Sequence, residues 1–99
     1  MHMAMPGHPS TPVLAGLLAV AEDAGLDGRR FVRAAACGIE MELRLAWLAQ
    51  PDHYEAGWHS TATLGTIGSA IASAEALQAD DLTRRHAIGL AVSQAAGLK

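Results

Sequence analysis

A histidine that directly precedes a predicted helix is the residue best suited to chemistry in this sequence. His59 is followed by Ser60 and Thr61, and Thr63 lies in the first turn of the same predicted helix. The first turn of a helix has unpaired backbone N–H groups and a positive dipole end, which favour an anion. An imidazole beside these donors can hydrogen-bond a carboxylate or move a proton near its reacting carbon. The pattern indicates a carboxylate site in which His59 is catalytic and the three hydroxyls bind substrate; the alternative is that His59 only caps the loop.

A second histidine, His8, precedes another predicted helix by a similar distance. Two imidazoles held by two loops can converge on one substrate, so His8 is the second catalytic candidate. His53, Tyr54 and Glu55 lie on the loop that leads to His59; the alternatives are that they support the site around His59 or that they are simply exposed, and we expect them to be exposed. His86 is expected to be a partly buried or surface histidine.

Metal, cofactor and thiol chemistry are not predicted for this chain. The histidines do not follow the HExxH spacing, and the single cysteine, Cys37, has no second thiol with which to hold a metal. Because Cys37 lies in an apolar run, it is predicted to be a small buried packing residue. Gly65 and Gly68 lie inside a predicted helix with no strand before it, so a phosphate-binding loop is not expected.

The elements that must position these residues are helices, and no strand pattern competes with them. We predict an all-α fold, a small Ala- and Gly-rich bundle in one unit over residues 6–99, after a disordered or vector-derived start at 1–5. Pro51 ends the second helix, Asp80 caps the fourth, and residues 51–60 form a loop. The four predicted helices cover residues 12–24, 28–50, 61–76 and 81–96.

Each predicted helix has a pattern that indicates what it packs against. A small-residue stripe in the third allows another backbone to approach closely and makes this helix central; it consists of Ala62, Gly65, Ser69, Ala72 and Ala76. The second has a solvated stripe with a favourable Glu40–Arg44 pair. Its predicted buried stripe consists of Phe31, Ala35, Gly38, Leu45 and Leu48. The fourth is apolar nearly all round, which is typical of a helix buried on more than one side.

Composition restricts the possible partners and compartments. The 99 residues carry a formal net charge of −3 without a basic stripe, which argues against nucleic acid. Glycines and charges interrupt every apolar stretch before about twenty residues, so no membrane span is expected. The single cysteine and the lack of a basic leader region indicate the cytoplasm. A core of mostly Ala and Leu is thin, so we expect a homo-oligomer or a missing partner chain.

Several of these segments together resemble one protein family. The run from Gly57 to Gly68 resembles the MmgE/PrpD signature, in which glycine, an aromatic residue, histidine, a short residue and threonine lead into a Leu-Gly step and an Ala-rich helix. Three other segments resemble family motifs in the same order: His8-Pro9-Ser10, the Ala-rich run 34–40, and the Ser-Gln-Gly stretch 87–98. The resemblance covers residues 6–99 and is specific in combination.

The resemblance implies a piece of the family's large helical domain. Members include 2-methylcitrate dehydratase, cis-aconitate decarboxylase and iminodisuccinate epimerase, which are metal-independent lyases and isomerases of small di- and tricarboxylates, usually homodimeric. By this resemblance, His8 and His59 fall on active-site histidines of the family.

The chain departs from the family pattern in three respects. No Asp-Asp-Thr-type segment precedes His8, the catalytic lysine segment is not clearly present at Lys99, and the smaller α+β domain is absent. We therefore expect a truncated or partial enzyme with little activity alone. The alternatives are one subunit of a split enzyme and a non-catalytic helical module that self-associates.

Overall fold

The computed structural model describes residues 1–99 and contains five helices and no strand. They are α1 (Ser10–Ala24), α2 (Gly28–Ala49), α3 (Asp52–Glu55), α4 (Ser60–Ala76) and α5 (Asp81–Gln94). The predicted all-α class is confirmed, and the four predicted helices correspond to α1, α2, α4 and α5 within two residues at each end. The single turn α3 lies in the segment predicted as a loop.

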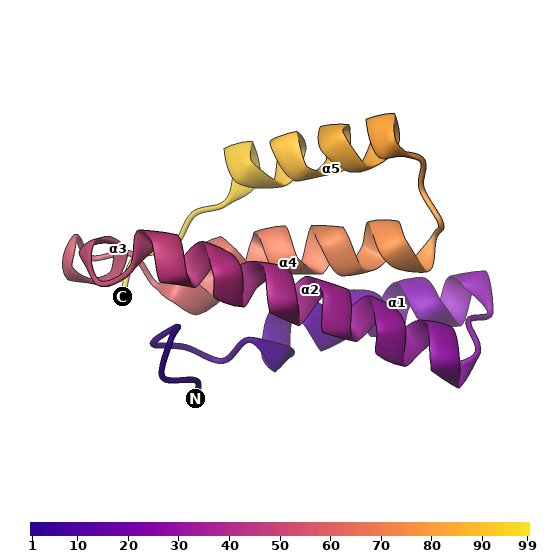
Figure 1. Cartoon of the computed structure of the whole chain (residues 1–99), viewed down its shortest axis with the longest axis horizontal. Coiled ribbons are helices and arrows are strands. Elements are labelled where there is room, and N and C mark those ends of the chain that lie inside the picture. Colours follow the sequence, from indigo (N-terminus) through magenta and orange to yellow (C-terminus); the bar gives the residue numbers. More distant parts are fainter.

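Local signals in the sequence account for the helix boundaries. Gly25 ends α1 in the left-handed conformation, with φ of 62°. Asp27 caps α2 and Asp80 caps α5, each by accepting a backbone N–H three residues later. The α1–α2 turn and the α4–α5 loop lie at the same end of the molecule (Figure 1).

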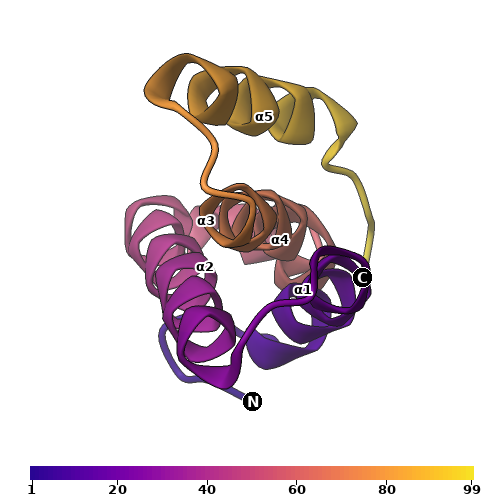
Figure 2. The ribbon, with the colours of Figure 1, turned by 90° about the vertical axis from the view of Figure 1, so that its right-hand side faces the viewer.

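α4 is the central helix, as its small-residue stripe predicts. It packs against α1 and α2 on one side and carries α5 on the other, so that α5 stands apart from α1 and α2 (Figure 2). Glycines at the α2–α4 contact allow close approach: a Cβ on Gly38 would lie 2.6 Å from the backbone oxygen of Gly68. The larger buried cluster between α1, α2 and α4 consists of Val13, Leu17, Ala34, Ala72 and Ala76.

The first residues of the chain contribute to a second buried cluster. Met5 is fully buried and packs with Ala46 of α2 and Leu64 of α4. The backbone N–H of His2 donates to the oxygen of Gly7, which folds this segment back on itself. None of the five helices combines the length and the hydropathy that a bilayer crossing requires.

Two predictions about the faces of α2 are wrong. Cys37 is exposed rather than buried, and Leu48 is 86% exposed rather than part of the buried stripe. The fully buried residues of α2 are Ala34, Gly38, Glu42 and Ala46. Gly38 is thus buried as predicted, and the other predicted residues, Phe31, Ala35 and Leu45, are half-buried. The predicted Glu40–Arg44 pair forms on the exposed face, at 2.7 Å. α5 buries only Ala91, so most of its apolar surface is uncovered in this chain.

Candidate functional site

His59 is the N-terminal cap of α4. Its Nδ1 accepts a hydrogen bond from the backbone N–H of Ala62 at 3.3 Å. Since Nδ1 is the acceptor, the proton of the neutral ring lies on Nε2. The ring is partly exposed and Nε2 has no partner in the chain, so this nitrogen is free to donate to a ligand. The backbone N–H of Thr61, which is half-buried, likewise donates to no atom of the chain; the N–H of Ser60 also has no acceptor, but Ser60 is fully buried.

Two of the predicted ligand hydroxyls hold the loop before α4. Ser60 is buried, and its Oγ accepts from Nε2 of Gln50 at 2.7 Å. Thr63 is also buried; its Oγ1 donates to the backbone oxygen of His59 and lies 2.7 Å from Nε2 of His53. These contacts fix the position of His59, so both hydroxyls have a structural partner already. His53, expected to be exposed, is half-buried because of this bond.

The segment that carries His8 lies against the first turn of α4. The backbone N–H of His8 donates to Oγ1 of Thr61 at 2.9 Å, and the His8 side chain is exposed. Thr61 follows His59 by two residues, so the fold brings the two histidine-bearing segments to the same end of α4. The Thr61 hydroxyl accepts in this bond and keeps its own proton available for another acceptor.

The end of the chain closes the loop from the other side. His59 donates its backbone N–H to the oxygen of Gly97, and Lys99 donates to the oxygen of Gly57, both at 3.0 Å. Figure 1 shows the C-terminus beside α3. The ammonium of Lys99 lies 4.1 Å from the centre of the Tyr54 ring, which is a cation–π contact. The only lysine of the chain thus lies beside the candidate site and is engaged by Tyr54.

Sequence reasoning missed a buried carboxyl group at the α2–α4 contact. Glu42 is fully buried, and neither of its carboxyl oxygens has a hydrogen-bond partner. It fits against α4 because Gly68 has no side chain: a Cβ there would lie 3.1 Å from the carboxyl carbon. Burial raises the pKa of Glu42 to about 8, so the side chain is mostly neutral at pH 7. The signal in the sequence was its position four residues after Gly38, on the same face of α2.

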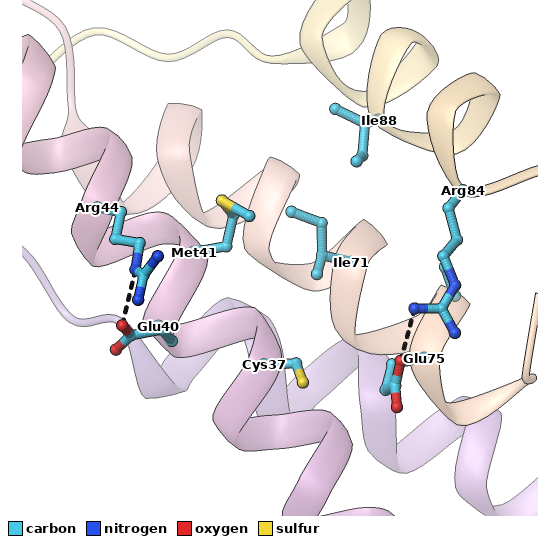
Figure 3. A pocket seen from close by; sticks show the side chains of 9 residues that line it. Cys37, Glu40, Met41, Arg44, Ile71, Glu75, Arg84 and Ile88 are labelled. Atoms are coloured by element: carbon cyan, nitrogen blue, oxygen red, sulfur yellow. Dashed lines mark hydrogen bonds and ion pairs between the residues drawn. The ribbon is translucent and has the colours of Figure 1, made fainter. Parts of the chain in front are cut away.

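A separate hollow lies between α2, α4 and α5 (Figure 3). Its volume is about 380 Å³, and its rim carries the Glu40–Arg44 and Glu75–Arg84 ion pairs. No histidine lines it, so it is distinct from the site around His59. The apolar residues that line it are Cys37, Met41, Ile71, Ala74 and Ile88.

Comparison with known proteins gives one match. The family model described as the MmgE/PrpD N-terminal domain matches residues 1–99. Neither the curated proteins nor the solved structures gave a significant match to the chain.

Proposed function

Because the chain belongs to the MmgE/PrpD family, we propose that it is a partial enzyme related to the lyases and isomerases of small di- and tricarboxylates. His8 and His59 are the acid/base or carboxylate-binding groups of this proposal. It is supported above all by one observation: the His8 segment is hydrogen-bonded to the first turn of the helix that His59 caps. We place the protein in the cytoplasm, because its single cysteine fits a reducing compartment.

The groups at this end of α4 suit a carboxylate that must be held while a proton moves. Dehydration, decarboxylation and epimerisation each need one group that binds a carboxylate and another that transfers a proton nearby. The free N–H group of Thr61, with the Thr61 hydroxyl, supplies the first requirement. Nε2 of His59 and the exposed ring of His8 supply the second. Ser60 and Thr63 support substrate binding by holding the loop.

Binding of cis-aconitate is expected to depend on His59. Replacement His59→Gln removes an imidazole that donates to a charged carboxylate, a contact of about 1.5 kcal/mol, so affinity should fall about tenfold. Titration of cis-aconitate followed by the amide NMR shifts of residues 57–63 measures this. His86→Gln is the matched control, since His86 is exposed on α5. Equal affinity of the His59 and His86 variants would contradict the proposed role.

A second candidate function is self-association, favoured by the outer face of α2. Trp47 is 80% exposed and Leu48 is 86% exposed, and both line a hollow of α2 together with Glu40 and Arg44. Large apolar side chains that stay exposed next to one another are typical of a surface that contacts another chain. A homo-oligomer that covers this face also fits the thin Ala-rich core.

Charging this face is expected to separate the oligomer. Trp47→Glu places a carboxylate in the proposed contact and should weaken self-association by at least about tenfold, because a large aromatic anchor is lost as well. Sedimentation velocity over a concentration series measures the effect. Leu18→Glu is the control, because Leu18 is exposed on α1, on another helix. A wild-type chain that sediments as a monomer at all concentrations would refute self-association.

A further inference from the structure

Arginines from two distant parts of the sequence converge at the end of α4 opposite His59. Arg30 and Arg33 lie near the start of α2, and Arg84 lies in the first turn of α5. Glu75, near the end of α4, forms an ion pair with one arginine of α2 and one of α5. Its Oε1 lies 3.0 Å from Nε of Arg33, and its Oε2 lies 2.8 Å from Nη1 of Arg84. The Arg84–Glu75 pair is drawn in Figure 3. The fold thus creates a basic cluster that neither sequence segment forms alone.

The guanidinium groups of this cluster are only partly used by the chain. Arg30 donates through Nη2 to the backbone oxygen of Ala76, and Arg84 donates through Nε to that of Ala79. Both terminal nitrogens of Arg33, and Nε and Nη1 of Arg30, donate to no atom of the chain. Three arginines and one glutamate lie in this cluster, which leaves an excess of two positive charges, and Arg30 forms no ion pair with the glutamate. These unused donors and charges therefore remain available to a ligand.

Nearby acidic side chains do not neutralise this excess by direct pairing. Asp27 accepts the backbone N–H of Arg30 as the cap of α2, and Asp80 accepts that of Thr83 as the cap of α5. The hydrogen bonds from Thr83 hold the pKa of Asp80 below its ordinary value. Neither carboxylate forms an ion pair with a guanidinium group of the cluster.

The arginines surround a hollow that is lined only by charged and polar residues. Its volume is about 250 Å³. Such a lining suits a compact charged group better than an apolar ligand body. We call it the arginine hollow; it is lined by Arg30, Arg33, Glu75, Gln78 and Arg84.

We propose that the arginine hollow binds the phosphate group of a small phosphorylated molecule. Guanidinium forks match phosphate oxygens in bidentate geometry. Three guanidinium groups that reach the hollow from two helices suit a tetrahedral group with three terminal oxygens better than a planar carboxylate. A phosphate dianion would also balance the excess of two charges. The 17 residues of α4 place this site about 25 Å from the end that carries His59, so it is separate from the proposed carboxylate site.

Inorganic phosphate titrated into the full chain tests this proposal. The titration is run at constant ionic strength with chloride as the balancing ion, and the amide NMR shifts of residues 30–33 and 75–84 are followed. Arg33→Gln should weaken phosphate binding at least about fivefold, since it removes a charge and four free N–H donors. Arg44→Gln is the matched control: Arg44 is also on α2, is 72% exposed against 75% for Arg33, and likewise pairs with a glutamate. It should change phosphate affinity less than about twofold.

A second variant separates a binding role from a purely structural one. Glu75→Gln removes the only carboxylate of the arginine hollow, so the excess charge rises from two to three. If the hollow binds phosphate, this variant should bind it about threefold more tightly, although two ion pairs are lost. Equal losses in the Arg33 and Arg44 variants, or unchanged or weaker binding by the Glu75 variant, would overturn the proposal.

Discussion

Raising the pH from about 5 to about 9 is expected to lower the free energy of unfolding by several kcal/mol through Glu42. Its pKa is about 8 in the folded chain, where the carboxyl group is buried, against 4.5 as the ordinary value. A folded-state pKa above the unfolded one means that the fold favours the protonated form. This contribution is fully present below about pH 4.5 and is lost as the pH rises toward 8. At about 1.4 kcal/mol for each pKa unit, the loss approaches 5 kcal/mol.

No charge of the surrounding helices compensates the ionised carboxylate. The residues that α1 and α4 place near the contact of α2 with α4 at Glu42 carry no charge: they are Pro12 and Val13 of α1, and Gly65 and Gly68 of α4. The only acid of α4 is Glu75 near its far end, already paired with arginines, and Glu40 of α2 is exposed on another face. His8 and His59 precede α1 and α4, and the ring of His53 is hydrogen-bonded to Thr63. Ionisation therefore leaves an unpaired charge between packed helices, which is strongly unfavourable.

Urea unfolding at pH 5 and at pH 9 measures this dependence. Glu42→Gln keeps a side chain of similar shape that does not ionise, so most of the fall in stability between pH 5 and pH 9 should disappear. Glu40→Gln is the control, because Glu40 is exposed and pairs only with Arg44. It should leave the pH dependence almost unchanged. A wild-type chain equally stable at both pH values would contradict a buried neutral carboxyl group.

The helices could be predicted from the sequence because their signals are local. Gly25 and Asp80 each fix a helix end through their own backbone or side chain, without any long-range contact. The small-residue stripe also correctly predicts that α4 is central, since only a close neighbour makes repeated glycines favourable. The exact buried line of α2 could not be predicted in this way. Leu48 lies in solvent, whereas Glu42, four residues after Gly38, lies in the core, against the ordinary preferences of both residue types.

The candidate sites also differ in how far they could be predicted, because some depend on local contacts and others on contacts between distant parts of the sequence. His59 as a cap at the start of a helix is a local feature, and the spacing of the sequence predicts it. The bond between the His8 segment and Thr61 spans 53 residues, and the arginine hollow joins residues more than forty apart. The sequence contains two short basic runs that are far apart. No local feature predicts that their arginines meet around Glu75.

A methyl group at Gly38 is expected to destabilise the fold by about 2 kcal/mol or more. The Cβ of Gly38→Ala would lie 2.6 Å from the backbone oxygen of Gly68 and 2.9 Å from Cβ of Ala72. A backbone oxygen inside a helix cannot move alone, so α2 and α4 must separate. The gain in helix propensity, about 1 kcal/mol, offsets only part of this cost. Thermal unfolding followed by circular dichroism should show a fall of about 8 °C or more.

Gly89→Ala is the matched control for this prediction. Gly89 also lies within a helix, but a Cβ there meets no atom within 4 Å. The same chemical change should therefore stabilise the chain by up to about 1 kcal/mol. Equal effects of the two substitutions would contradict close approach of α2 and α4.

The two predictions are physically linked, because Gly38 and Glu42 lie on the same buried line of α2. Separating α2 from α4 admits water to the carboxyl group, which lowers its pKa toward the ordinary value. Gly38→Ala should therefore lose part of the pH dependence of wild-type stability, whereas Gly89→Ala should retain all of it. If Gly38→Ala destabilises the chain but keeps the full pH dependence, Glu42 is desolvated by contacts other than the glycine-lined approach of α4.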